Sequence, residues 1–155
     1  MEKCVITGSF DPFTCGHQYL LDTARRFFDT VYLTVFINSE KAEFFSRSER
    51  LDMLKAVAAK YKNVYVDSYD GLVVDWCRQN NVRYIVRGVR SPDDYEYEKA
   101  MAEYNYREGN VVTLFVNGVN EISSREVRKR LKSGEDISGL VPSEILSLLR
   151  KKQGI

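Results

Sequence analysis

The chain has 155 residues, the size of one ordinary domain and enough to bury about 70% of the surface that the unfolded chain exposes. Its 23 Lys and Arg residues nearly balance 22 Asp and Glu residues, and the net charge is +1. This balance argues against nucleic acid and anionic membranes as partners, because they attract strongly basic proteins. We therefore expect one domain, residues 1–155, in which any anion site is local.

Strands and helices are predicted to alternate along the chain. Residues 31–37 and 111–116 are nearly continuous apolar runs rich in β-branched and aromatic side chains, which are typical of parallel strands covered on both faces. Helical periodicities separate the shorter apolar runs. Strands are expected at residues 4–6, 31–37, 64–66, 82–86 and 111–116.

Capping residues mark the predicted helix starts. At three places in the sequence, a residue that can cap a helix is followed three positions later by a glutamate. Two helices are expected after the last strand. The second of these is expected to begin around Pro142 and to end in a basic turn that complements the helix dipole. The expected pairs are Ser46 with Glu49, Asp93 with Glu96, and Ser123 with Glu126.

This order of elements predicts an α/β fold. We expect a Rossmann-like, doubly wound sheet of five parallel strands, joined by right-handed crossovers and followed by C-terminal helices. Ligands of such sheets bind beyond the carboxyl ends of the strands. The loops that follow the strands are therefore the place to look for chemistry.

The turn after the first strand, residues 8–17, is the most informative segment. It joins a strand to a helix through a glycine-rich stretch, so several backbone N–H groups and the positive end of the helix dipole face one point, as suits a phosphate. His17, the only histidine of the chain, falls in the first helical turn. Its ring is expected to face whatever the turn binds.

The other loops at this edge add donors and positive charge. They carry Lys41, the pair Arg87 and Arg90, and the pair Ser123 and Ser124. Neither a P-loop motif nor a G-x-G-x-x-G motif is present in the sequence. Such a set fits transfer of a phosphoryl or nucleotidyl group, in which catalysis is mostly positioning and neutralisation of charge.

The cysteines offer no alternative chemistry. Cys4, Cys15 and Cys77 are an odd number, far apart and without a C-x-x-C pair, which predicts free thiols in a reducing compartment. Cys15 lies near His17, but no orienting third group for a nucleophile is evident. The sequence also lacks a signal peptide and an apolar run of about 18 residues, so a cytoplasmic, membrane-free protein is expected.

Two motifs of this chain resemble those of the nucleotidyltransferase superfamily. The stretch G-S-F-D-P-F-T-C-G-H, residues 8–17, is similar to its T/HxGH signature, and I-S-S-R-E-V-R, residues 122–128, is similar to its second motif. Four further features narrow the resemblance to the phosphopantetheine adenylyltransferases. They are Lys41, the segment D-G-L-V-V-D at residues 70–75, R-G-V-R at residues 87–90, and the acidic and tyrosine-rich D-Y-E-Y-E at residues 94–98. The likeness extends from about residue 3 to residue 150.

The resemblance implies a reaction and a set of roles. The 4′-phosphate of phosphopantetheine attacks the α-phosphorus of ATP directly, Mg²⁺ arrives with ATP, and His17 stabilises the transition state with its ring protonated or donating a hydrogen bond. It further implies catalytic roles for His17, Lys41 and Arg90; acceptor binding by Ser9, Lys41, Val73 and Arg87; and nucleotide binding by Ser9, Phe10, His17, Gly88, Val89, Arg90, Glu98, Val119, Asn120, Glu121, Ile122, Ser123, Ser124 and Arg125.

The resemblance also implies partners beyond the substrates. It predicts that the protein forms a homo-oligomer, specifically a hexamer, and that coenzyme A is a feedback ligand. It predicts no metal site formed by the protein itself. Thr7, Ser9, Cys15 and Arg125 stand where the family commonly has proline, threonine, asparagine and serine. The alternatives are a sister enzyme acting on nicotinate mononucleotide or an alcohol phosphate, and a non-catalytic regulator that binds nucleotide.

Overall fold

The computed structural model describes residues 2–37, 42–117 and 122–152. Five strands form one sheet in the order β3-β2-β1-β4-β5, and every neighbouring pair is parallel. The expected doubly wound, Rossmann-like fold is therefore confirmed. The strands are β1 (Lys3–Gly8), β2 (Thr30–Phe36), β3 (Val64–Tyr69), β4 (Tyr84–Gly88) and β5 (Val112–Val116).

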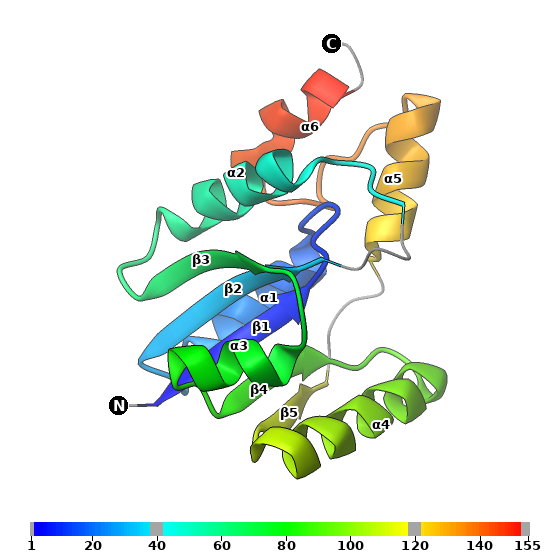
Figure 1. Ribbon diagram of the computed structural model, residues 1–155. Helices are drawn as coiled ribbons and strands as arrows, with labels where there is room; N and C mark the ends of the chain where they lie inside the picture. Colours follow the sequence, from blue (N-terminus) through cyan, green and yellow to red (C-terminus); the bar gives the residue numbers. More distant parts are fainter. Residues whose placement is uncertain (1, 38–41, 118–121, 153–155) are drawn as a thin grey trace.

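Helices cover both faces of the sheet. In Figure 1, α1 lies behind the sheet and α3 in front of it, while α2, α5 and α6 gather at one end of the molecule. The carboxyl ends of the strands face the side that opens between α4 and α5 (Figure 1). The helical segments are α1 (Cys15–Ala24), α2 (Arg47–Ala58), α3 (Val73–Asn80), α4 (Pro92–Gly109), α5 (Ser124–Ser133), the short 3₁₀ segment η1 (Ser143–Ile145) and α6 (Leu146–Lys152).

Alternation along the central strand divides the core into two clusters. Cys4 and Ile6 of β1 pack in the larger cluster, to which α1, α2, α5 and α6 contribute. Val5 points to the opposite face and joins the smaller cluster around Trp76 of α3. Because side chains of a strand point alternately to the two faces, an apolar run buried on both sides is what this central position requires.

The helix starts agree with the sequence in two places and differ in one. Ser46 and Glu49 form the expected capping box, and the Ser123 hydroxyl accepts from the Glu126 N–H at 3.1 Å. The prediction for α4 was wrong: Ser91, not Asp93, caps the helix, with its Oγ 3.2 Å from the Asp94 nitrogen. Pro92 explains the difference, since proline suits the first helical position and places the cap directly before it.

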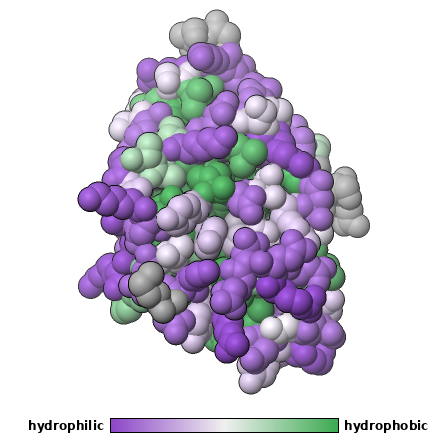
Figure 2. Space-filling view, turned by 60° about the vertical axis from the view of Figure 1, so that its left-hand side comes forward, coloured by the Kyte–Doolittle hydropathy of each residue, from purple (hydrophilic) through white to green (hydrophobic). Residues whose placement is uncertain are grey.

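The face shown in Figure 2 is mostly hydrophilic, with hydrophobic residues emerging in a patch near the centre and the top of the view. Within the described ranges, no helix combines the length and the apolar character needed to cross a bilayer. All three cysteines are free thiols.

Candidate active site

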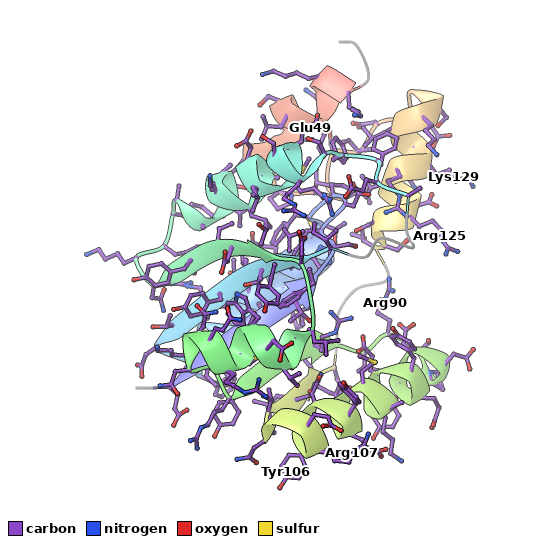
Figure 3. All side chains as sticks on the ribbon, in the orientation of Figure 1. Glu49, Arg90, Tyr106, Arg107, Arg125 and Lys129 are labelled. Atoms are coloured by element: carbon purple, nitrogen blue, oxygen red, sulfur yellow. The ribbon has the colours of Figure 1, made fainter. Side chains whose placement is uncertain are left out.

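A cavity of about 790 Å³ lies beyond the carboxyl ends of the strands, where the fold places ligands. Residues far apart in the sequence meet there because the five strands are parallel and adjacent. Figure 3 shows Arg90 and Arg125 at the open side between α4 and α5. The predicted site residues that line the cavity are Ser9, Phe10, His17, Val73, Arg87, Gly88, Arg90, Glu98, Ile122, Ser123, Ser124 and Arg125.

The other predicted residues are placed differently. Val89 does not line the cavity, and its N–H donates to the Val116 carbonyl at 3.2 Å, between the ends of β4 and β5. Lys41, Val119, Asn120 and Glu121 lie outside the described residues.

The first turn of α1 fixes the His17 ring. Thr14 is the N-cap, and its backbone N–H donates to His17 Nδ1 at 3.0 Å while the Thr14 hydroxyl accepts from the His17 N–H at 3.4 Å. His17 thus takes the place that glutamate usually has in a capping box. Since Nδ1 accepts a hydrogen bond, the single proton of the neutral ring resides on Nε2.

Burial and nearby arginines keep this ring neutral. Desolvation first, and then the positive charges of Arg87 and Arg90, lower the pKa of His17 to about 3. The ring also packs against Phe10 and Phe13, with centroids 4.9 and 5.3 Å away. Of the two forms that the resemblance implied, burial and the two arginines favour the neutral donor over the imidazolium.

Arg87 is held firmly from two sides. Its Nε donates to the Glu98 carboxylate at 3.0 Å, and its Nη1 donates to the carbonyl and, at 3.1 Å, to the hydroxyl of Thr7. The Glu98 side chain is largely buried, at 12% exposure, which favours a well-fixed charged pair. The Arg87 Nη2 also donates to the Glu98 carboxylate, so the charged end of Arg87 lines the cavity in a constant orientation.

The remaining arginines of the cavity are less constrained. Arg90 pairs with Asp94 at 3.4 Å, and both side chains are 39% exposed. The side chain of Arg125 makes no hydrogen bond or ion pair with any other residue that the structure describes. Arg90 can turn toward an incoming anion at small cost because exposed ion pairs contribute little, and Arg125 breaks no such contact when it turns.

The start of α5 is tied to the loop that follows β1. Ser124 Oγ donates to the Pro12 carbonyl at 2.8 Å, and Arg128 Nη1 donates to the Asp11 carbonyl at 2.8 Å. The two sequence motifs are thus in direct contact. The first-turn N–H groups of α1 and α5 both belong to this side of the molecule, which adds partial positive charge.

Several cavity residues were not predicted from the sequence. The spacing of Thr14 and His17 is that of a capping box, so the partner of the histidine could have been found by allowing histidine at the fourth position. The location of Thr7 at the cavity could have been expected, since Thr7 lies one residue before the carboxyl end of β1. Met101 and Asn105 of α4 also line the cavity, and no sequence signal distinguishes them from ordinary helical residues.

A cysteine nucleophile is not supported by the local environment. Burial and the charge of Glu144 raise the pKa of Cys15, so that its thiol stays protonated near neutral pH. Burial raises the pKa of both Cys4 and Cys77 to about 12. These side chains act as packing residues.

Among the described residues, the cavity lining offers few metal ligands. In the part of the chain that the structure describes, no three His, Cys, Asp or Glu side chains are grouped as a metal ion requires. The acidic residues that line the cavity, Asp94 and Glu98, are each paired with an arginine.

Comparison with known proteins shows the family to which the chain belongs. Residues 5–130 match the family model described as cytidylyltransferase-like. The chain is 38% identical over 155 residues to the phosphopantetheine adenylyltransferase of Streptomyces coelicolor, with 98% of each chain covered. It is 37% identical to the proteins of that name from Christiangramia forsetii and Thermobifida fusca, which it covers to 100% and 94%. The resemblance seen in the sequence is confirmed, and the chain belongs to the phosphopantetheine adenylyltransferase family of cytidylyltransferase-like nucleotidyltransferases.

Proposed function

We propose that this chain transfers the adenylyl group of ATP to 4′-phosphopantetheine, producing dephospho-coenzyme A and pyrophosphate, a step of coenzyme A biosynthesis. The observation that carries the proposal is the neutral His17, whose Nε2–H belongs to a cavity that Arg87, Arg90 and Arg125 also line. Such an arrangement stabilises charge on transferring phosphates without supplying a nucleophile of its own.

The reaction is a direct in-line displacement. An oxygen of the 4′-phosphate forms a bond to the α-phosphorus of ATP, and the bond from that phosphorus to the oxygen that bridges to the β-phosphate breaks. The attacking phosphate is already anionic, so no general base is needed. His17 Nε2–H donates to a non-bridging oxygen of the α-phosphate, where charge grows in the transition state.

We assign the remaining residues to two sides of the cavity. The acceptor phosphate is held by Arg87 and Lys41, next to Ser9 and Val73. The nucleotide lies along the opposite side, with its phosphates near Arg90 and the start of α5. The residues assigned to the nucleotide are Ser9, Phe10, His17, Gly88, Arg90, Glu98, Val119, Asn120, Glu121, Ile122, Ser123, Ser124 and Arg125.

We further propose that Mg²⁺ enters as a complex with ATP. Asp94 and Glu98 each neutralise an arginine, which leaves the phosphates of the nucleotide as the better oxygen ligands for a hard cation. Bound there, the ion supplies charge neutralisation on the leaving pyrophosphate.

Acceptor-dependent release of pyrophosphate from ATP tests the proposal. We expect turnover with 4′-phosphopantetheine and background rates with nicotinate mononucleotide and with an alcohol phosphate. Turnover only with one of the latter acceptors indicates a sister enzyme. Binding of ATP without release of pyrophosphate for any acceptor indicates a regulator and overturns the proposed reaction.

A homo-oligomer, with a hexamer as the family expectation, is proposed on exposed apolar side chains of α4 and β5. Tyr106 of α4 is 60% exposed, and Leu114 of the edge strand β5 is 40% exposed. An edge strand with apolar side chains is a ready pairing surface. Light scattering coupled to size-exclusion chromatography measures the assembly, and a monomer at micromolar concentration excludes it.

Coenzyme A is proposed as a feedback ligand because it shares the pantetheine and adenylyl groups of the product. The cavity of about 790 Å³ is large enough for a ligand of drug-like size or more. Competition between coenzyme A and 4′-phosphopantetheine in the pyrophosphate assay tests this, and unchanged turnover at millimolar coenzyme A rejects it.

A further inference from the structure

Arg50 is a buried cation that lies outside the cavity lining. It sits in the first turn of α2, and only 3% of its side chain is exposed. It pairs with Glu43 at 2.8 Å, and that carboxylate is 46% exposed. Burying one partner of an ion pair while the other stays in water is a poor source of stability, because the buried charge is desolvated. The position of Arg50 therefore calls for another reason.

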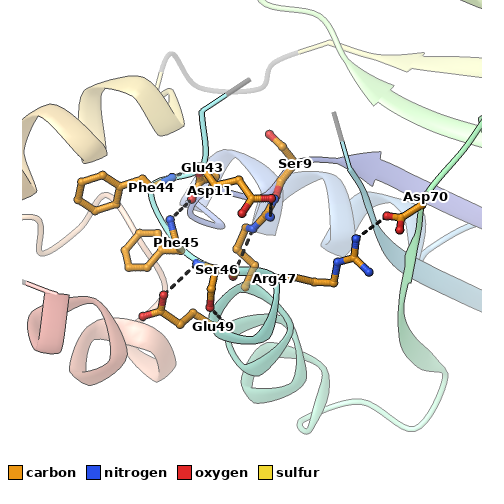
Figure 4. Close-up of polar contacts among 10 residues, drawn as sticks. Ser9, Asp11, Glu43, Phe44, Phe45, Ser46, Arg47, Glu49 and Asp70 are labelled. Atoms are coloured by element: carbon orange, nitrogen blue, oxygen red, sulfur yellow. Dashed lines mark hydrogen bonds and ion pairs between the residues drawn. The ribbon is translucent and has the colours of Figure 1, made fainter. Parts of the chain in front are cut away.

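The second contact of Arg50 supplies this reason. Its Nη1 donates to the Ser9 carbonyl at 3.1 Å, in the loop that leads from β1 into the cavity (Figure 4). Because the peptide bond is planar and trans, a carbonyl that points toward Arg50 turns the N–H of Phe10 to the opposite side. Ser9 and Phe10 line the cavity and Arg50 does not. The N–H of Phe10 is thus directed away from Arg50, in a loop whose residues Ser9 and Phe10 line the cavity.

The conformation of Phe10 makes such a hold necessary. Its φ is +49°, a left-handed value that costs energy for a residue with a side chain and persists only where the surroundings impose it. The ring, 1% exposed, lies against His17 and so close to Gly8 that a Cβ there would be 3.3 Å from Phe10 Cζ. No hydrogen bond joins the Phe10 N–H to another residue of the described segments.

The rest of the loop is held in the same manner, from behind. The Asp11 carboxylate accepts from the backbone N–H groups of Phe44 and Phe45 at 2.9 and 2.8 Å (Figure 4). The carbonyls of Asp11 and Pro12 accept from Arg128 and Ser124. Carbonyl groups of the loop are therefore bound by side chains of other helices, which keeps their negative ends away from an incoming phosphate.

We propose that Arg50 is a positioning residue that fixes the Ser9–Phe10 peptide, so that the Phe10 N–H donates to a phosphate oxygen of the nucleotide beside His17. The proposal rests on the proposed adenylyl transfer. The buried charge also polarises the peptide, since its carbonyl end faces the cation and its N–H end points away from it. Through the packed Phe10 ring, the same contact fixes the position of the His17 imidazole.

Three variants separate this role from a purely structural one. Arg50→Lys keeps a positive charge beside Glu43, but its single ammonium group lacks the planar fork that reaches Glu43 and the Ser9 carbonyl together. Arg50→Met removes the charge and keeps the length of the side chain. Arg47→Met is the matched control, because Arg47 lies one turn earlier on α2 and pairs with Asp70 at the surface (Figure 4).

The readouts are kcat for pyrophosphate release, the melting temperature and the NMR signals of the Phe10 amide and the His17 ring. We expect Arg50→Met to lower kcat by about 10- to 100-fold per folded molecule, as for a misplaced catalytic group. Arg50→Lys is expected to keep the melting temperature, to lower kcat less, and to shift the His17 signals. ATP is expected to move the Phe10 amide proton of the wild type, and to move it less in both variants.

The outcomes distinguish the inference from the proposed function. A wild type that releases no pyrophosphate with any acceptor overturns the proposed function. An active wild type with both Arg50 variants within about twofold of Arg47→Met per folded molecule overturns the positioning role. Loss of activity that merely follows the unfolded fraction, with unchanged Phe10 and His17 signals, overturns it as well.

Discussion

His17 serves two purposes that are rarely combined in one side chain. In a capping box the third helical residue is usually Glu or Gln, and its side-chain oxygen accepts from the N-cap N–H. Here the imidazole Nδ1 accepts from the Thr14 N–H instead. A glutamate in this place would bring a negative charge toward the phosphates. The neutral ring completes the cap without that charge and retains one N–H for the substrate.

The protonation state of His17 can be observed directly, because it is the only histidine of the chain. We expect ¹⁵N NMR to show one neutral imidazole with the proton on Nε2, and to show no protonation as the pH falls from 8 to 5. Burial and the two arginines place the pKa at about 3, far below this range. A ring that titrates near pH 6.5 in the free protein contradicts this electrostatic account.

The same lowered pKa has a consequence for stability with a defined sign. The unfolded chain protonates His17 near pH 6.5, whereas the folded protein does so only near pH 3. Between these values the unfolded state binds more protons, so the wild type loses stability as the pH falls. Relative to His17→Gln, the free energy of unfolding of the wild type is expected to decrease from pH 6.5 toward pH 3 and to be constant above pH 7.5. Urea unfolding at several pH values measures this difference.

Removal of the imidazole is expected to damage catalysis more than binding. His17→Ala should lower kcat by at least about 100-fold, corresponding to roughly 3 kcal/mol, as the loss of one transition-state donor does in other enzymes. The dissociation constant of ATP is expected to change little, since Arg90 and the helix starts remain. Calorimetry gives the binding constant and pyrophosphate release gives kcat. Unchanged turnover in a folded His17→Ala variant removes His17 from the mechanism.

For single residues, the sequence predicts which side chains lie in the site better than it predicts their protonation state or their contacts. The motif around His17 could be recognised, and twelve of the predicted site residues do line the cavity. The tautomer could not be predicted, because it depends on the direction of one backbone N–H. Arg50 could not be found either, since its contacts with Ser9 and Glu43 arise only when α2 packs beside the loop after β1.

At the scale of elements, the apolar runs of the sequence predicted where the strands lie, but the observed strands begin and end at other residues than predicted. The strand expected at residues 82–86 is β4 (Tyr84–Gly88), because Val82 is a buried residue of the segment that links α3 to β4. The strand expected at residues 64–66 continues to Tyr69, since β3 pairs with β2 along its whole length, through polar Asp67 and Ser68. Pairing with a neighbour, which no local pattern contains, decides such boundaries.

The start of α4 offers a test of competing caps. Ser91→Ala is expected to lower the free energy of unfolding by about 1 kcal/mol, because the hydroxyl satisfies the Asp94 N–H. Asp93→Ala removes the residue that the sequence favoured, and should cost less, through the helix dipole alone. Chemical denaturation of both variants measures the two values. A larger loss for Asp93→Ala than for Ser91→Ala contradicts the cap seen in the structure.

At the scale of the whole molecule, the parallel sheet brings the site residues that the structure describes to one edge. Binding of ATP with Mg²⁺ at this edge is therefore expected to raise the free energy of unfolding of the whole domain. At one hundred times its dissociation constant the nucleotide is expected to add about 2.7 kcal/mol and to raise the melting temperature by about 5–10 °C. Differential scanning calorimetry measures this shift.

Two variants provide the control for this effect. Arg90→Ala is expected to reduce the shift at the same ATP concentration, because it removes a cation from the cavity lining. Arg83→Ala is expected to preserve it, since Arg83 precedes β4 at the opposite edge of the sheet, near Glu2 and Lys3. Equal shifts in both variants and the wild type place the nucleotide elsewhere.

The central position of β1 has a consequence for how the protein is made. On the ribosome the chain emerges from its N-terminus, so β1, β2 and β3 are available to pair before β4 has been synthesised. Cys4 must nevertheless keep an open side for Tyr84, its partner in β4. The half-sheet of the nascent chain already carries His17, but Arg87, Arg90 and α5 join it only later. The ability to bind ATP is therefore expected to appear late in translation, after most of the hydrophobic core has formed.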